Sequence, residues 1–357
     1  MPSLLNLGLL VLLTTLILPA VVTANPPGED AGTGLAPMLE LEECWKRMSP
    51  TTSGGGQPLP SWARMLAGEL PKTTAALLGL DLAHRTASPL DPGLRAMMRW
   101  ISAQANHCEY AQAVALFDAG RAGLDEARIA SLRSGDHSGL SASDRAALEF
   151  ARKMTVESAS VTDDEFAALV KHFGEKKAAA MVLLMAHANF QDRLLNCLGA
   201  PIEPGGPMAP VEVRFEVGKA VGKPMPPSPI AKSPLTRATG SDLINDPADW
   251  IATDYGTLQD RLENQRRRHT RLPIPTWDDV AKGLPGGLFS RPSLVIWNRI
   301  CLGYVPELAV PFEILMRTAG AEIGPRYDRI FGQGVFWVTT KAVECSYCMG
   351  HCEMNWE

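Results

Sequence analysis

The chain has 357 residues, which is room for about two domains of ordinary size. With 46% apolar residues and a net charge of −5, it differs from a disordered chain and lacks the basic balance of a nucleic-acid-binding protein. Aromatic residues make up only 6%, and the many Ala and Leu residues favour helices over β-structure. We therefore expect an all-α protein that binds no nucleic acid.

The N-terminus has the pattern of a secretory signal peptide over residues 1–24. An uncharged apolar run occupies residues 7–18, and small residues before Asn25 fit cleavage at that point. The mature protein is then expected to be secreted or periplasmic, where thiol pairs can form disulfides. The alternative is an uncleaved membrane anchor that carries an exported domain. Residues 25–38 are rich in Gly and Pro, so we expect a flexible segment there.

A first helical domain is predicted over residues 39–200. Asp91 followed by Pro92 combines a helix cap with the residue favoured at the first helical position. Ser143 is a candidate cap for a further helix, because its hydroxyl can accept a hydrogen bond from a free backbone N–H. Nothing in this region alternates between apolar and polar residues as a strand would.

The end of this first domain is predicted to hold two successive helices. A capping box over residues 162–165 begins a short helix that ends at Gly174, and a long apolar helix follows over residues 176–198. His187 lies on the long apolar helix. We interpret it as a core histidine whose hydrogen bonds are satisfied.

A proline-rich stretch divides the chain. Residues 201–241 are dense in Pro and predict an extended linker or an arm that wraps around the fold. The helical pattern returns over residues 242–357, which form the predicted second domain.

The second domain resembles the first. At an offset of 237 residues, Trp100 aligns with Trp337 and Cys108 with Cys345, and both tryptophans are interpreted as core anchors. We read a tandem duplication. The first copy continues about 90 residues beyond its Cys, whereas the second stops soon after its own, so the second copy is expected to be incomplete.

Seven cysteines are too few for a disulfide-built scaffold, and their number is odd. Three of them, Cys345, Cys348 and Cys352, fall close together near the C-terminus, which suggests chemistry rather than general cross-linking. Cys44 and Cys301 are a further candidate pair that the sequence does not decide.

The Cys-x-x-Cys spacing is the main chemical signal. On a helix, Cys345 and Cys348 share a face, and a helix N-terminus would favour a thiolate there. His351 lies one turn beyond Cys348 and can exchange a proton with it. Such a dithiol can reduce a peroxide, one thiolate becoming a sulfenic acid that the other converts to a disulfide. A purely structural disulfide, or a metal site that also uses Cys352, are the alternatives.

Residues 345–348 read Cys-Ser-Tyr-Cys and match the redox motif of the carboxymuconolactone decarboxylase/AhpD-like alkylhydroperoxidase family. The chain resembles this family over residues 60–199 and 292–357. The resemblance implies small all-helical domains that assemble into homo-oligomers. It also implies a peroxide substrate, a thiol or dithiol reductant, and no cofactor or metal beyond the redox-active Cys pair.

The chain departs from the family pattern at several positions. The family's His falls on Cys352, one residue after His351, and its Glu, twelve residues before the first Cys, is Gln333. A Gln cannot relay a proton as a carboxylate does. In the first copy the second Cys and the His are replaced by Ala111 and Ala115, so that copy is expected to be redox-inactive.

The sequence therefore predicts an exported thiol-dependent peroxidase or disulfide oxidoreductase. Cys348 is the predicted attacking thiol and Cys345 the resolving one, because His351 is closer to Cys348 around a helix. A non-catalytic helical oligomerisation or binding module is the alternative, and lactone decarboxylation is a weaker one. Further candidate site residues are Cys352, Gln333 and Cys108.

Overall fold

A computed structural model of the protein describes most of the chain between residues 37 and 356. The described ranges are 37–48, 52–53, 56–215, 255–286, 288–289, 292–293, 295–324, 328–343 and 345–356. The predicted signal peptide, nearly all of the flexible segment after it and most of the predicted linker lie outside the described residues. Within the described part, no helix is both long and apolar enough to cross a membrane.

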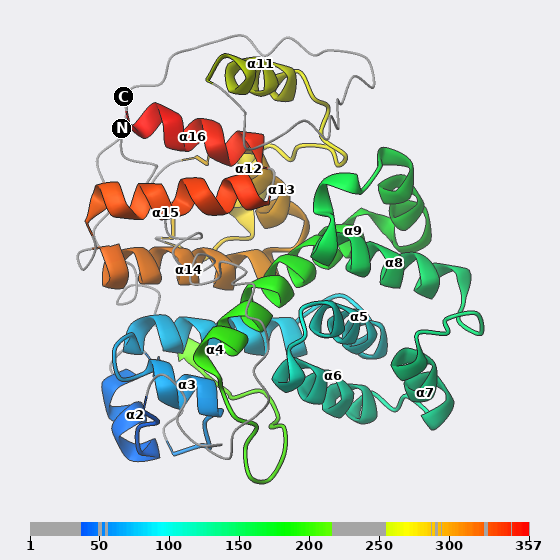
Figure 1. Cartoon of the computed structure of the whole chain (residues 1–357), viewed down its shortest axis with the longest axis vertical. Helices are drawn as coiled ribbons and strands as arrows, with labels where there is room; N and C mark the ends of the chain where they lie inside the picture. Colours follow the sequence, from blue (N-terminus) through cyan, green and yellow to red (C-terminus); the bar gives the residue numbers. More distant parts are fainter. Residues whose placement is uncertain are drawn as a thin grey trace, which may run out of the picture.

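Helices make up 71% of the described structure, which confirms the all-α prediction (Figure 1). Within the described ranges, the strands are two residues each: β1 (Thr52–Ser53) pairs antiparallel with β2 (Arg214–Phe215). The helices of the first region are α2 (Leu41–Met48), α3 (Ser61–Leu66), α4 (Pro71–Thr86), α5 (Pro92–Ala105), α6 (Glu109–Arg121), α7 (Glu126–Ser134), α8 (Ala142–Val156), the short 3₁₀ helix η1 (Ser158–Ser160) and α9 (Asp163–Leu198).

The helix starts follow local capping chemistry. The Asp91 carboxylate accepts from the N–H of Leu94 at 3.0 Å, and Thr162 forms the predicted capping box with Glu165. The prediction of Ser143 as a cap is wrong. Ser141 caps α8, because its extended backbone directs the hydroxyl at the first turn, in which Ser143 already lies.

Gly174 breaks α9 where the sequence predicted a helix end. Its φ of 78° is left-handed, a conformation that glycine adopts without the steric cost of a side chain. The two segments on either side of it are the predicted short helix and the predicted long one.

The arm that leaves α9 lies against the first region. A Glu203 carboxylate oxygen accepts from the Tyr110 hydroxyl at 2.6 Å and from the Ser61 N–H at 2.8 Å. Val211 and Val213 are buried in the same cluster as the apolar side chains of α2 and α3. The start of the predicted linker therefore wraps the fold.

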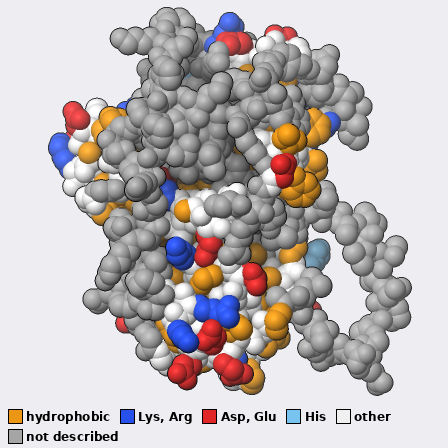
Figure 2. Space-filling model, turned by 90° about the vertical axis from the view of Figure 1, so that its left-hand side faces the viewer, with side chains coloured by type: hydrophobic (Ala, Val, Ile, Leu, Met, Phe, Trp, Pro, Cys, Tyr) orange, Lys and Arg blue, Asp and Glu red, His pale blue; other side chains and the backbone are white. Residues whose placement is uncertain are grey.

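The charged side chains near α2 include both signs, as Figure 2 shows for the lower part of one face.

The second region stacks onto the first through its earliest helices. Apolar residues of α13 and α14 belong to the same two buried clusters as α4, α5, α8 and α9, and α14 lies alongside α4 (Figure 1). The Glu322 carboxylate accepts from the N–H groups of Lys72 and Thr73 at 3.1 and 2.7 Å, and so caps the start of α4. The helices of this region are α11 (Tyr255–Arg266), α12 (Trp277–Lys282), α13 (Ile296–Tyr304), α14 (Pro306–Ile323), α15 (Arg329–Ala342) and α16 (Ser346–Trp356).

The last helices form an outer layer with a small core of its own. Phe336 of α15 and Cys352 of α16 are its buried centre, with Trp337 and Cys348 packed against them. Helix α11 covers α16 so closely that a side chain on Gly350 would collide with Leu262. This layer holds the predicted cysteine pair.

Backbone hydrogen bonds recur at the 237-residue offset. Asp91 caps α5 and Asp328 caps α15, each accepting from the N–H three residues later. The N–H groups of Cys108 and Cys345 each donate to the carbonyl five residues earlier, at 2.9 Å. These shared details are what a duplicated unit would produce. The duplication and the domain boundaries stay predictions.

Candidate functional site

The candidate site is a disulfide between Cys345 and Cys348 at the start of α16. Their Cα atoms are 5.3 Å apart, and both side chains are half-buried. Cys345 stands just before α16 and Cys348 lies in its first turn, and the disulfide and a hydrogen bond between them place both on one side of the helix start. The Cys345 N–H bonds back to the Thr340 carbonyl at the end of α15.

Cys345 has the position of a helix cap. The backbone N–H of Cys348 donates to the Cys345 Sγ, with 3.3 Å between nitrogen and sulfur. The free N–H groups and the dipole of a helix N-terminus stabilise negative charge at this position. When the disulfide is reduced, these groups favour the thiolate of Cys345.

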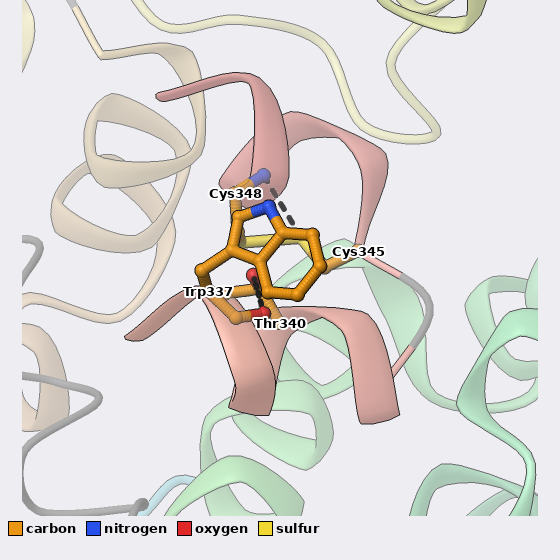
Figure 3. The surroundings of a disulfide bond; sticks show 4 residues. All are labelled: Trp337, Thr340, Cys345 and Cys348. Carbon is orange, nitrogen blue, oxygen red and sulfur yellow. Dashed lines mark hydrogen bonds between the residues drawn. A yellow bond between two sulfur atoms is a disulfide. The ribbon is translucent and has the colours of Figure 1, made fainter. Parts of the chain in front are cut away.

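Helix α15 supplies the other wall of the site. Figure 3 shows Trp337 and Thr340 beside the disulfide. The Thr340 hydroxyl donates to the Trp337 carbonyl at 3.0 Å, and the Lys341 ammonium lies 4.6 Å from the centre of the indole ring.

The remaining predicted site residues are Cys352, Gln333 and His351, and they differ in burial and in their contacts. Cys352 is 0% exposed, packs against Phe336 and takes no part in the disulfide. Gln333 lies one turn before Trp337 on α15, and its Oε1 is buried with no hydrogen-bond partner among the described residues. His351 belongs to α16, but its side chain lies outside what the structure describes.

Cys108 occupies the matching position before α6 but in a closed environment. Its side chain is 1% exposed, and burial raises its pKa to about 11. Ala111 and Ala115 are buried nearby where the motif would place a Cys and a His. The interpretation of Cys108 as a buried apolar residue is therefore confirmed.

The other cysteines form no disulfide. Cys44 is buried and Cys301 half-buried, and the structure leaves both as free thiols, so the suggested pair is not formed. Burial raises the pKa of Cys301 to about 12. Among the described residues, no group of three or more His, Cys, Asp or Glu side chains is arranged to hold a metal ion.

A polar cavity in the first region was not expected. His187 is buried as predicted, but both ring nitrogens lack hydrogen-bond partners among the described residues, so the expectation of a satisfied histidine is wrong. It stacks on His84, which approaches from α4, a helix distant in sequence. The signal available in the sequence was the spacing of Arg95 and Arg99, which places two cations on one face of an otherwise apolar helix.

Comparisons with known proteins identify no family for the chain. No family model, no curated protein and no solved structure matches it. The resemblance to the AhpD-like family therefore rests on the motif and spacing described above.

Proposed function

We propose that the protein is a dithiol-dependent peroxidase or disulfide oxidoreductase of the AhpD-like kind. The observation that carries the proposal is the half-exposed Cys345–Cys348 disulfide at a helix N-terminus. A structural disulfide has no need of thiolate stabilisation, whereas a catalytic one depends on it.

The proposed reaction begins with the reduced pair. One thiolate attacks an oxygen of the hydroperoxide, the O–O bond breaks, and the alkoxide leaves as an alcohol after taking up a proton. The resulting sulfenic acid is attacked by the second thiol, which forms the disulfide and releases water. A dithiol reductant then exchanges with the disulfide, restores both thiols and is itself oxidised.

The cap geometry bears on which thiol attacks. The sequence favoured Cys348 because of its spacing to His351. The hydrogen bond from the Cys348 N–H to the Cys345 sulfur supports the opposite order, with Cys345 as the more acidic thiol. We therefore propose Cys345 as the attacking thiol and Cys348 as the resolving one. His351 remains the proposed residue that exchanges a proton with the thiols, and Gln333 can only orient groups by hydrogen bonding.

The proposed function includes a substrate, a reductant, an oligomeric state and a cellular location. The substrate is a small peroxide and the reductant a thiol or dithiol, and the protein acts as a homo-oligomer after export from the cytoplasm. An oxidising compartment requires a dedicated reductant, because the glutathione pool that reduces cytosolic disulfides is absent or more oxidised there.

Thiol counting with Cys→Ser variants tests the proposal. The reduced full chain should lose two thiols per molecule on treatment with peroxide and regain them with a dithiol. Cys345→Ser should abolish peroxide consumption. Cys348→Ser should leave a trapped sulfenic acid on Cys345, unless Cys352 rescues it, so Cys352→Ser is the third variant. Cys108→Ser is the matched control and should behave as the parent.

Each variant also distinguishes the alternatives. If Cys345→Ser retains the sulfenic acid and Cys348→Ser loses it, the order predicted from the sequence holds. If neither variant slows peroxide consumption, the pair is not catalytic. The alternative, a non-catalytic helical scaffold, then explains the protein better. The apolar residues of α13 and α14 that complete the core of the first region are consistent with it.

A further inference from the structure

The first region encloses a polar cavity that the dithiol chemistry does not use. Helices α4, α5, α6 and α9 surround it. Its walls include Ala96 and Ala115, which stand twelve residues before and seven residues after Cys108. Those are the places where the redox motif carries a Glu and a His, so short side chains leave space where that motif would fill it.

Two stacked histidines form one wall. The rings of His84 and His187 lie 4.5 Å apart and nearly parallel, and both side chains are almost completely buried. The Nδ1 of His84 and both nitrogens of His187 have no hydrogen-bond partner among the described residues. Burial, together with the positive charge of Arg99, keeps the pKa of His187 low, at about 3. The ring is therefore neutral and presents one N–H donor and one acceptor.

Three arginines also line the cavity, and they are unequally paired. Arg85 is saturated, because its Nε and Nη2 bind both carboxylate oxygens of Asp118 at 2.8 and 2.7 Å and its Nη1 pairs with Asp81 at 3.3 Å. Arg95 is 8% exposed, and none of the ion pairs among the described residues includes it. The charges of Asp118, Asp81 and Asp91 act on it through space, but its guanidinium forms no side-chain hydrogen bond among the described residues, so its N–H groups are available to a ligand.

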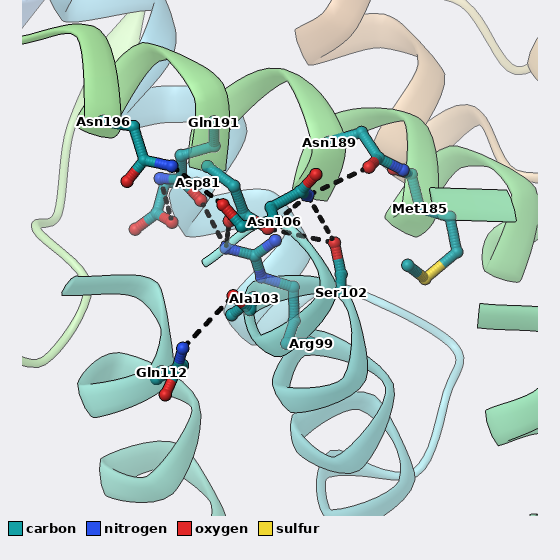
Figure 4. Close-up of polar contacts among 11 residues, drawn as sticks. Asp81, Arg99, Ser102, Ala103, Asn106, Gln112, Met185, Asn189, Gln191 and Asn196 are labelled. Atoms are coloured by element: carbon teal, nitrogen blue, oxygen red, sulfur yellow. Dashed lines mark hydrogen bonds and ion pairs between the residues drawn. The ribbon is translucent and has the colours of Figure 1, made fainter. Parts of the chain in front are cut away.

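Arg99 offers a second free donor. Its Nη2 donates to Asp192 at 2.9 Å and to Gln191 at 3.2 Å, and Figure 4 shows the side chain reaching from α5 toward Gln191 on α9. Its Nη1 is buried with no partner among the described residues. Asp192 balances the charge of Arg99, so what the cavity wall lacks is an acceptor for the free N–H groups of Arg95 and Arg99.

We infer that this cavity binds a small organic anion, a monocarboxylate, between Arg95, the free Nη1 of Arg99 and the N–H of His187. A carboxylate supplies two acceptor oxygens for these donors and binds planar guanidinium groups in the geometry they prefer. The alanines and other apolar wall residues leave room for a short hydrocarbon tail. The site is separate from the Cys345–Cys348 pair, and the inference does not depend on the proposed peroxidase function.

Calorimetric titration of the full chain with straight-chain monocarboxylates from formate to hexanoate tests the inference. Sodium chloride at equal ionic strength and the matching neutral amides are the controls. We expect saturable binding of one carboxylate per chain and none of the amides. Arg95→Gln should weaken binding at least about tenfold, because a charge-assisted hydrogen bond is lost. Arg133→Gln, on the exposed side of α7, should not.

A second measurement keeps the test decisive if Arg95→Gln fails to fold. In the parent chain, the imidazole nitrogen resonances of His187 should shift on titration with the carboxylate and saturate at the calorimetric affinity. Binding should persist in the Cys345→Ser chain, so a failure of the peroxidase proposal leaves this result intact. The inference is overturned if no carboxylate binds saturably, if the amides bind equally well, or if the His187 resonances do not respond.

Discussion

Cys108 and Cys345 lie 237 residues apart in matching backbone positions, yet their surroundings differ. Each precedes a helix and bonds back to the carbonyl five residues earlier. Cys108 is buried in a cluster with Phe190 and Leu194 of α9, whereas Cys345 stays half-exposed and bonds to Cys348. Local backbone geometry therefore positions a cysteine, and the elements that cover it determine its reactivity.

The same contrast holds for the helices that precede the two cysteines. Leu94 and Ile101 of α5 are buried in the core that α8 and α9 complete. The residues at the same offset on α15, Phe331 and Val338, are 60% and 43% exposed. An apolar side chain at the same place on the helix thus contributes differently to the free energy of unfolding in the two regions, because it is buried in one and exposed in the other.

The largest expected effect is on stability at these aligned apolar positions. Leu94→Ala should lower the free energy of unfolding by about 2–5 kcal/mol, because it leaves a cavity in a packed core. Phe331→Ala is the matched control and should change it by about 0.5 kcal/mol or less, because the ring is largely in solvent. Urea unfolding of both variants measures the difference. Equal losses would show that α15 is covered in solution.

The next largest expected effect is on the rates at which the thiols of Cys108 and Cys345 are alkylated. With a pKa of about 11, only about 0.1% of Cys108 is thiolate at pH 8, against roughly a quarter of an ordinary thiol. Iodoacetamide should therefore modify Cys108 about 100-fold more slowly than Cys345 in the reduced protein. Peptide mass spectrometry over time gives both rates, and labelling in urea is the control for intrinsic reactivity. Comparable rates in the folded state would remove the distinction between the sites.

The polar cavity sharpens the comparison further, because the residues that line it all belong to the first region. At the 237-residue offset, Arg95 and Arg99 align with Gly332 and Phe336. Burial lowers the pKa of both His84 and His187. The acid sensitivity that follows from these histidines should therefore reside in the first region.

The expected acid effect has a definite sign. Between about pH 6.5 and pH 3 the unfolded chain binds a proton on His187 that the folded chain excludes, so stability falls as the pH falls. The slope from this residue is about 1.4 kcal/mol per pH unit. His187→Leu should reduce the slope of unfolding free energy between about pH 6 and pH 4, and exposed His172→Leu should not. Identical slopes in the parent and His187→Leu would contradict the assignment.

Features set by neighbours in sequence were predictable, and features set by distant segments were not. The Asp91 cap, the capping box at Thr162 and the break at Gly174 depend on hydrogen bonds or backbone angles within a few residues. The cap at Ser141 was missed because two nearby serines compete, and only the backbone entering α8 selects between them. The unpaired state of His187 was missed because its neighbours come from helices far along the chain.

The sequence by itself determined the helical class, the caps at Asp91 and Thr162, the break at Gly174 and the Cys345-x-x-Cys348 pair. The tertiary structure decided that Cys108 is closed, that Cys345 caps a helix, and that α4 and α14 share a core. The physical reason is the range of each interaction. Helix hydrogen bonds and caps join residues a few positions apart, whereas burial, and with it the pKa of a thiol or an imidazole, depends on segments that meet only when the whole chain folds.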